Sequence, residues 1–420
     1  MLSPKYVREN PKKVKENTLT RGYQDKLVND WLKLDGQWRE LLVVVEGLRQ
    51  ERNKLNAELK KNKDKPPADQ LEKSKKLKRE LQEKESKLAD LQKDWKEALW
   101  KIPNLLADDV PLGKDESENV EIRKWGEPPQ FGFKPLDHTE LGLRLGIIDI
   151  KRASKVSGSR FGYFKGDGAL LELAVMWHAF EKLASKGFIP VIPPVVIKKK
   201  IERGLGYAEH GGWDQVYLFE KGKVVFVGSS EHSVIPMHKD EVFKDKDLPR
   251  RYVNFSTCFR REAGTYGKDT KGMFRVHQFN KVEMNVYTMP DVKVSDKECL
   301  NMLSFQEEIV QELGLPYRVV HACAGDQPFP NRRMYDLEIW FPGQERYRET
   351  HSCSNCTDFQ TRRLNIKVKT KEGNKFVHAL NATAITDRAV IAIIENYQQK
   401  DGSVSVPEVL QKWVGKKKIS

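Results

Sequence analysis

The stretch that decides the fold runs from Cys258 to Glu283 and reads C-F-R-R-E-A-G-T-Y-G-K-D-T-K-G-M-F-R-V-H-Q-F-N-K-V-E. Two strand-like segments flank a glycine-rich, charged loop, a pattern typical of a β-hairpin. Arg260 and Glu262 would share one face of the first strand, and Arg275 and Phe279 would lie on the returning strand. Arginine suits phosphate oxygens, a carboxylate can accept from an adenine amino group, and an aromatic ring can stack on the base. The segment is therefore compatible with an ATP-binding strand pair.

Residue types alone leave a second interpretation open for this segment. It could be an ordinary hairpin whose cross-strand salt bridges each contribute little to stability. The sequence contains neither G-x-x-x-x-G-K-[ST] nor G-x-G-x-x-G, so a nucleotide site of either glycine-rich type is excluded.

The sequence around this segment predicts an α+β domain over residues 136–420, because strand-like and helix-like segments alternate along it. The expected strands include Lys223–Gly228, Lys281–Tyr287 and Tyr335–Phe341. The expected helices include Ala169–Lys186 and Lys297–Leu313. A Pro- and Gly-rich connector, residues 105–135, precedes this domain.

The first 104 residues have a different pattern and form a separate predicted domain. A short helical lead-in over residues 1–26 would turn near Arg21-Gly22, and two heptad-patterned helices would follow over about residues 27–102. Pro66 and Pro67, within Lys63–Asp69, must interrupt the helix between them. The sequence therefore predicts an antiparallel helical hairpin, each arm reaching on the order of 50 Å.

Composition narrows the choice of partner and compartment. The net charge of +14 makes an anionic partner plausible, although a solvated Lys-rich arm would give the same excess. No segment has the roughly 20 apolar residues needed to span a bilayer, so we expect no membrane association. The five cysteines suggest a reducing compartment, and we expect a cytoplasmic protein. Cys353 and Cys356 form a C-x-x-C without a second pair, so no zinc is expected.

Several segments together resemble those of seryl-tRNA synthetases, which are class II aminoacyl-tRNA synthetases. F-R-R-E with R-V-H-Q-F-x-K-V-E resembles motif 2, and the resemblance extends over about residues 1–412. The other segments that carry it are G-F-I-P-V-I-P-P (Gly187–Pro194, motif 1), G-S-S-E (Gly228–Glu231), R-Y-R-E-T-H-S-C-S-N-C-T-D-F-Q-T-R-R (Arg346–Arg363), N-A-T-A-I-T-D-R (Asn381–Arg388, motif 3), K-P-L-D-H-T-E-L (Lys134–Leu141) and S-K-V-S-G-S-R-F (Ser154–Phe161).

The resemblance implies a class II antiparallel sheet flanked by helices, with the hairpin as a tRNA-binding arm. It implies an enzyme that activates L-serine with ATP and Mg²⁺ and then charges serine tRNA. It also implies a homodimer formed through the region around Gly187–Pro194.

The resemblance further implies a role for individual residues. The catalytic residues would be Arg260, Glu349 and Arg388, and Mg²⁺ would bind Glu349 and Ser352. Serine would be bound by Ser229, Ser230, Glu231, Arg260, Glu283, Asn381 and Thr383. ATP would be bound by Arg260, Arg261, Glu262, Arg275, Val276, Phe279, Glu349, Thr350, His351, Ser352 and Arg388.

Two departures from the family pattern keep other functions open. Ser229 stands where threonine is usual, and the segment from Asn381 to Arg388 is one residue shorter than the family spacing. Either the helix that follows begins earlier, or the phosphate contact of Arg388 is weakened. The alternatives are a synthetase-like paralogue that binds RNA without aminoacylation, and an aminoacyl-carrier-protein ligase. The latter relatives lack the hairpin.

Overall fold

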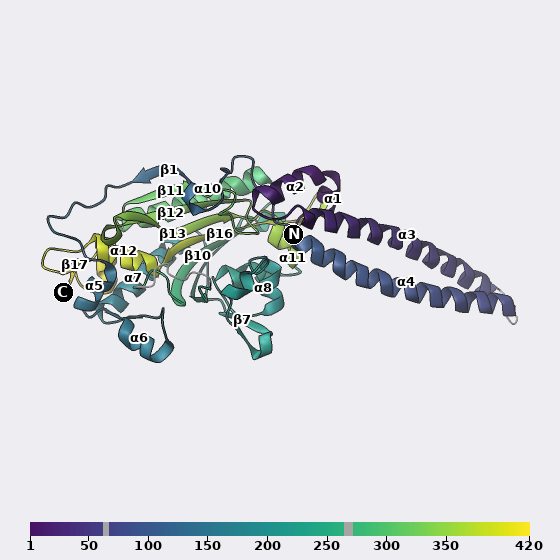
Figure 1. The fold of residues 1–420 in the computed structure, drawn as a ribbon, viewed down its shortest axis with the longest axis horizontal. Helices are drawn as coiled ribbons and strands as arrows, with labels where there is room; N and C mark the ends of the chain where they lie inside the picture. Colours follow the sequence, from purple (N-terminus) through teal and green to yellow (C-terminus); the bar gives the residue numbers. More distant parts are fainter. Residues whose placement is uncertain (62–66, 264–271) are drawn as a thin grey trace. The chain divides into compact units, whose positions relative to one another are not determined.

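The computed structural model describes residues 1–61, 67–263 and 272–420, and it divides into two compact units (Figure 1). One unit is Leu2–Pro103, and the other combines Met1 with Asn104–Ser420. None of the described helices is both long and apolar enough to cross a lipid bilayer.

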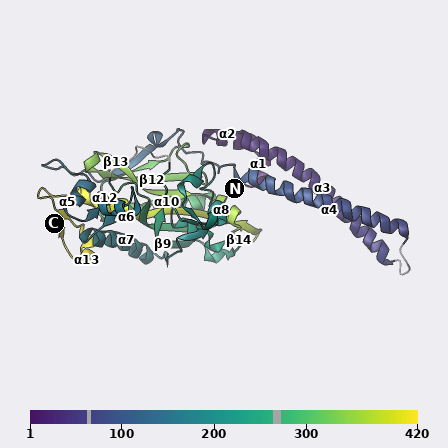
Figure 2. The same cartoon turned by 60° about the horizontal axis from the view of Figure 1, so that its bottom comes forward.

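The smaller unit is a long helical hairpin. After α1 (Pro4–Glu9) and α2 (Pro11–Thr20), the chain turns at Arg21-Gly22 as predicted. Helices α3 (Lys26–Lys61) and α4 (Ala68–Trp100) then run side by side in both ribbon views (Figures 1 and 2). The predicted hairpin is confirmed, whereas most of its predicted turn lies at 62–66, outside the described residues.

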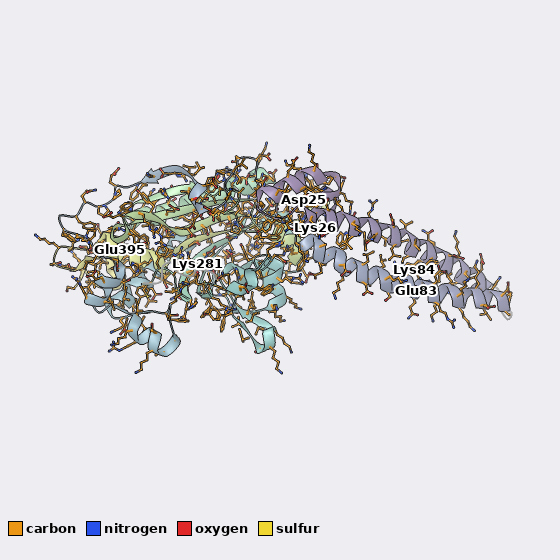
Figure 3. All side chains as sticks on the ribbon, in the orientation of Figure 1. Asp25, Lys26, Glu83, Lys84, Lys281 and Glu395 are labelled. Carbon is orange, nitrogen blue, oxygen red and sulfur yellow. The ribbon has the colours of Figure 1, made fainter. Side chains whose placement is uncertain are left out.

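An apolar seam holds α3 against α4. Val45, Leu81 and Leu88 are buried between the helices, and the exposed faces carry charges such as Glu83 (Figure 3). This is how heptad-spaced apolar residues stabilise a helix pair in water.

Aromatic packing fixes the part of the hairpin where α3 begins and α4 ends. The Trp95 ring lies 5.8 Å from Trp31 and 5.6 Å from Trp38, centroid to centroid. The Trp95 Nε1 donates to Asp35 Oδ1 over 2.9 Å, and Asp35 also pairs with Arg8. These contacts satisfy the indole N–H, which a buried tryptophan requires.

The larger unit is built on an eight-stranded sheet in the order β1-β11-β12-β13-β16-β10-β9-β4. All neighbouring strands are antiparallel except β4 and β9, which are parallel. The strands are β1 (Val120–Trp125), β4 (Ile189–Val191), β9 (Arg250–Phe259), β10 (Gln278–Thr288), β11 (Tyr317–His321), β12 (Arg333–Phe341), β13 (Arg346–Asn355) and β16 (His378–Thr386).

The two faces of this sheet differ in chemistry because side chains alternate along each strand. On β10, Val282, Met284 and Val286 belong to the main apolar core, which also contains residues of α7 (Asp167–Ser185), α10 (Val292–Glu312) and α12 (Asp387–Asn396). The intervening Lys281 and Glu283 are therefore directed to the opposite face. Polar side chains that could bind a ligand therefore lie on this opposite face of the sheet.

Smaller elements complete the unit. The predicted α+β class is confirmed: the expected helices correspond to α7 and α10, and the expected strands to β7, β10 and β12. The remaining elements are α5 (His138–Arg144), α6 (Ile150–Ser157), α8 (Lys199–Leu205), α9 (Glu231–Val234), α11 (Phe359–Leu364), α13 (Gln411–Val414), β2 (Ile148–Asp149), β3 (Tyr163–Phe164), β5 (Val196–Lys198), β6 (Leu218–Phe219), β7 (Val224–Phe226), β8 (Val242–Lys244), β14 (Lys367–Thr370), β15 (Gly373–Phe376), β17 (Val404–Ser405) and β18 (Lys418–Ile419).

Candidate active site

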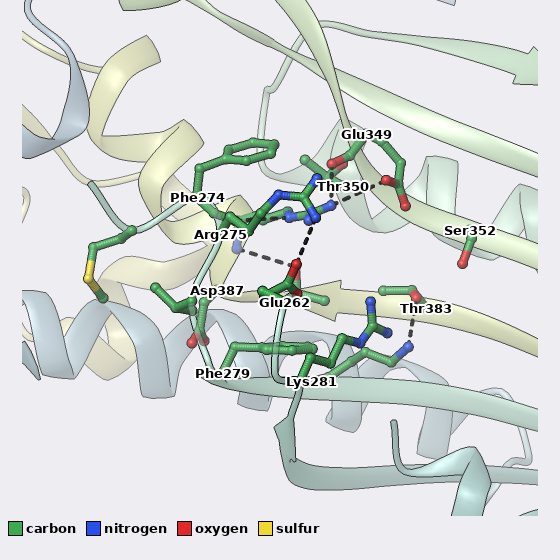
Figure 4. Close-up of a pocket in the computed structure, with 15 residues that line it drawn as sticks. Glu262, Phe274, Arg275, Phe279, Lys281, Glu349, Thr350, Ser352, Thr383 and Asp387 are labelled. Atoms are coloured by element: carbon green, nitrogen blue, oxygen red, sulfur yellow. Dashed lines mark hydrogen bonds and ion pairs between the residues drawn. The ribbon is translucent and has the colours of Figure 1, made fainter. Parts of the chain in front are cut away.

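Two adjoining cavities lie on the polar face of the sheet, one of about 100 Å³ (Figure 4) and one of about 900 Å³. They share eight lining residues, so they form one continuous site. The shared residues are Arg260, Glu262, Phe274, Arg275, Lys281, Glu349, Ser352 and Arg388. Most of the predicted ATP-binding residues are thereby brought together.

The Glu262 and Arg275 side chains form one wall of this site. Arg275 Nη1 donates to Glu262 Oε2 over 2.8 Å (Figure 4). Their predicted backbone setting was wrong, because β9 ends at Phe259 and Glu262 has a left-handed φ of 50°. Arg275 precedes β10 instead of lying on it. The side chains meet because the chain leaves and re-enters the strand pair beside the same cavity, while 264–271 lies outside the described residues.

Aromatic rings contact guanidinium groups in the walls of the two cavities. The Phe274 ring lies 3.7 Å from the Arg348 guanidinium carbon and 4.6 Å from that of Arg388. Arg260 lies over the Phe279 ring at 5.3 Å, and its Nε donates to the Gly228 carbonyl over 3.0 Å. Cation–π contacts of this kind hold the long arginine side chains in place beside the cavities.

Helix α12 delivers Arg388 into the site despite the shortened segment before it. Thr386 caps the helix by accepting from the Arg388 N–H over 3.2 Å, so Arg388 stands in the first turn. Its Nη1 donates to the Glu349 carbonyl over 2.7 Å. Burial and the neighbouring Arg260 and Arg275 lower the pKa of Arg388, against the opposing effect of Glu349. Positive charges crowded in this way favour a polyanion.

A buried polar cluster lies on β10 and β16 next to the arginines. Lys281 Nζ pairs with Glu283 and donates to Thr383 Oγ1 over 3.1 Å, and Thr383 donates to Glu283 over 3.4 Å. Burial raises the pKa of Glu283 to about 8, with Glu231 adding to the rise and Lys281 opposing it. A small ligand with an ammonium and a hydroxyl group would complement these groups.

Tyr207, Glu231 and His232 form the far end of the larger cavity. The Tyr207 ring stacks on His232 with centroids 5.1 Å apart, and Asn381 Nδ2 donates to the Tyr207 hydroxyl over 3.3 Å. Burial raises the pKa of Tyr207 well above its ordinary value, so this hydroxyl stays protonated.

Sequence reasoning missed several lining residues, namely Tyr207, His232, Phe274, Lys281 and Arg348. Lys281 had a usable signal, since it precedes Glu283 by two residues on a predicted strand and must share its face. Tyr207 and His232 had none, because their place depends on how α8 and α9 fold over the sheet.

The predicted residues do not all reach the cavities. Val276, Phe279, Thr350 and Thr383 line the smaller one, and the larger one adds Glu231 and Asn381. The others lie elsewhere: Arg261 is exposed, and Ser229, Ser230, Glu283 and His351 are buried without contributing to either lining. Burial lowers the pKa of His351 to about 3, so this side chain is a neutral histidine of the interior.

The donor groups near Glu349 suit Mg²⁺ if a ligand supplies further oxygens. Glu349 and Ser352 both line the site, and Asp336 lies opposite Ser352 in the β12–β13 ladder. Burial and the nearby Glu349 raise the pKa of Asp336 well above its ordinary value. A divalent cation would relieve this crowding of carboxylates. Among the described residues, no group of three or more His, Cys, Asp and Glu side chains is placed to hold a metal unaided.

The cysteines have separate surroundings. Cys353 Sγ lies 3.6 Å from Cys299 Sγ, whereas Cys356 Sγ contacts Asn331 Oδ1 at 3.3 Å. All five cysteines are free and buried. The C-x-x-C spacing therefore reflects two different packing environments.

Comparison with known proteins gives matches to two family models. Residues 1–106 match the seryl-tRNA synthetase N-terminal domain, and residues 220–397 match the tRNA synthetase class II core domain (G, H, P, S and T).

Full-length relatives are also found. The serine–tRNA ligase of Pyrococcus horikoshii is 43% identical, covering 100% of this chain and 97% of the relative. That of Thermodesulfovibrio yellowstonii is 44% identical, covering 99% of both chains. Among solved structures, P. horikoshii seryl-tRNA synthetase complexed with ATP superposes with a TM-score of 0.93 at 41% identity, covering 100% of this chain and 99% of the other. The cytoplasmic serine–tRNA ligase of Naegleria fowleri in complex with AMP superposes with a TM-score of 0.88 at 32% identity. The match covers 99% of this chain and 97% of the other.

Proposed function

The chain belongs to the seryl-tRNA synthetase family, and from this premise we propose how its own residues carry out the family's reaction. It is a class II, ATP-dependent serine–tRNA ligase: serine is activated to seryl-adenylate and then transferred to serine tRNA. The observation that carries the proposal is the convergence of three arginines, Glu262 and Phe279 on one site beside the Lys281–Glu283–Thr383 cluster. The relatives named above give no support to either alternative, the inactive paralogue or the carrier-protein ligase.

The arginines supply electrostatic stabilisation in the activation step. Serine's carboxylate attacks the α-phosphorus of ATP, and pyrophosphate leaves. Arg260 binds the α-phosphate and the serine carboxylate, while Arg275 and Arg388 bind the outer phosphates. Guanidinium groups held in advance stabilise the charge that develops on phosphate oxygens without reorganising. No protein nucleophile is required, so catalysis rests on positioning and charge.

We propose the remaining roles from the family resemblance, and the following contacts support them. Glu262, held by Arg275, accepts from the adenine amino group, and Phe279 stacks on the ring. Glu231 and Glu283 bind the serine ammonium and hydroxyl, and Asn381 and Thr383 close the side-chain pocket. A site that hydrogen-bonds a hydroxyl discriminates strongly against alanine, because the site's own polar groups would then stay unpaired.

We propose that Glu349 and Ser352 hold Mg²⁺ together with phosphate oxygens of ATP. When bound, the ion neutralises phosphate charge. We expect Glu349→Gln to raise the Mg²⁺ concentration for half-maximal pyrophosphate exchange by about tenfold or more, since the variant loses an anionic ligand. The measurement is a Mg²⁺ titration after chelation. Glu345→Gln, an exposed neighbour outside the lining, is the matched control and should keep the wild-type requirement. An unchanged requirement in Glu349→Gln would remove Glu349 as a ligand.

One pair of assays tests the proposed function. Serine-dependent ATP–pyrophosphate exchange reports activation, and charging of serine tRNA reports transfer. Both activities are expected. Exchange without charging would favour a carrier-protein ligase, and the absence of both would favour an inactive paralogue.

We propose that the α3–α4 hairpin binds serine tRNA. Its exposed faces are rich in lysine and arginine, which suits contacts to a phosphate backbone, and RNA is commonly recognised by shape.

The free cysteines fit a reducing compartment, which supports a cytoplasmic location.

We propose a homodimer formed through α7 and the region around Gly187–Pro194. Three large apolar side chains there are exposed: Leu173 (59%), Trp177 (52%) and Ile192 (73%). Apolar groups clustered in this way are typical of an interface. We expect Ile192→Asp to convert a dimer to a monomer in analytical ultracentrifugation. Leu112→Asp, at a residue 79% exposed in the connector, is the matched control and should sediment like the wild type. A dimer that survives Ile192→Asp would contradict this interface.

A further inference from the structure

His232 lies between two buried carboxylates, and no predicted role accounts for it. Its Nδ1 is 2.9 Å from Glu202 Oε2, and its Nε2 is 3.8 Å from Glu231 Oε1. Glu202 lies on α8 and is 1% exposed, and His232 is its one ion-pair partner among the described residues. A buried carboxylate needs a countercharge, which a protonated imidazole supplies.

The surroundings of His232 set its orientation and charge. Tyr207 stacks on the imidazole with an interplanar angle of 11°, which fixes the ring plane. The charged groups that face it are Glu202 from α8, Glu231 beside it on α9, and Arg260 after β9. Burial and Arg260 lower the pKa of His232, but the two carboxylates more than offset this, and the pKa is raised above its ordinary value.

Glu231 has several partners besides His232. Its negative charge also acts on Tyr207 and on Glu283, the acidic residue of the buried cluster on β10, and raises the pKa of both. A charge on the imidazole therefore acts on Glu231 through an ion pair of 3.8 Å, in competition with these neighbours. With both nitrogens protonated, each faces a carboxylate as a donor.

We propose that His232 is a positioning residue for serine binding: held as an imidazolium between Glu202 and Glu231, it orients the Glu231 carboxylate toward the substrate ammonium. This rests on the proposed function, and it adds a group that contacts neither serine nor ATP in the roles given above. Glu202 is an essential part of the arrangement. Its negative charge balances the imidazolium, so that Glu231 keeps a net attraction for an ammonium group.

The sign of the pH effect follows from this arrangement. As the pH rises through the pKa of His232, one ring nitrogen loses its proton and becomes an acceptor facing a carboxylate. The orientation of Glu231 is then lost, and the KM for serine should rise. Titration of Glu283 and of the substrate ammonium also contributes to the profile, but it is common to all variants and cancels in a comparison between them.

The test is the pH dependence of the KM for serine in pyrophosphate exchange, with the KM for ATP measured in parallel. His232→Gln should raise the KM for serine about tenfold or more at pH 6.5 and below, where a raised pKa keeps His232 largely protonated, because Glu231 loses a buried countercharge. The KM for ATP should stay within about twofold. The rise in serine KM that the wild type shows with increasing pH should be absent.

Glu202→Gln is the second variant, because it keeps the shape of a buried side chain and removes only its charge. It should shift the rise in serine KM to lower pH, since Glu202 raises the pKa of His232. The inference would be overturned if the KM for ATP rose as much as the KM for serine. It would also be overturned if both variants kept the wild-type pH dependence of the KM for serine. Either result would leave the proposed function standing. A wild-type chain without serine-dependent exchange would overturn the proposed function, and this inference with it.

Discussion

Replacing Arg260 with alanine is expected to abolish serine-dependent pyrophosphate exchange, with a loss on the order of 10³-fold in kcat/KM. The side chain lines both cavities, together with Arg275 and Arg388, and the larger cavity also contains Glu231. In the proposed mechanism it contacts both reacting groups, so its removal weakens transition-state stabilisation and positioning together. The measurement is exchange under saturating ATP and serine, followed by separate titrations of each.

The adjacent Arg261 provides a matched control. It has the same charge, is exposed, and does not line either cavity, so Arg261→Ala should retain exchange within about twofold. Binding of serine tRNA should be nearly unchanged in Arg260→Ala, because the proposed reader is the helical arm. Exchange retained by Arg260→Ala would remove Arg260 from the reaction.

Shortening the arm is expected to have the opposite effect: exchange continues and charging is lost. Val45 packs with Leu88 and Arg49 pairs with Glu85, so these parts of α3 and α4 face one another. A short glycine-rich turn can therefore replace residues 42–91 and join the two helices. The cut keeps the aromatic contacts of Trp95 with Trp31 and Trp38. We expect charging at subsaturating tRNA to fall by at least about 10²-fold, since the removed surface supplies the proposed phosphate contacts.

Exchange by the shortened chain is the internal control for an intact catalytic unit. Salt dependence gives an independent check, because the wild-type KM for tRNA should rise with salt and much of that slope should disappear with the arm. Charging that survives the deletion at the wild-type KM would show that the arm is not the reader of tRNA.

Much of the fold could be predicted because its signals are local. Heptad spacing over about residues 27–102 specifies the hairpin, and α3 and α4 correspond to this range. Alternating strand-like and helix-like segments give the α+β class. The order of the eight strands could not be read from the residues alone, because it depends on pairings between segments far apart in the chain, such as β13 with β16.

The site could be predicted in part, because some of its residues belong to local sequence motifs. Motif residues such as Arg260, Arg275 and Arg388 reach one cavity, as their resemblance to family motifs implies. Their local backbone could not be predicted, because Glu262 adopts a left-handed conformation that residue type does not reveal. Glu202 and His232 are 30 residues apart in sequence, and only the packing of α8 against α9 brings them together.

A crystal structure with a non-hydrolysable seryl-adenylate analogue tests the central claim most directly. The account predicts the adenine on Phe279 beside Glu262, the phosphate mimic at Arg260, and the seryl ammonium at Glu231 and Glu283. An analogue bound away from the cavity between β9, β10 and α12 would contradict it.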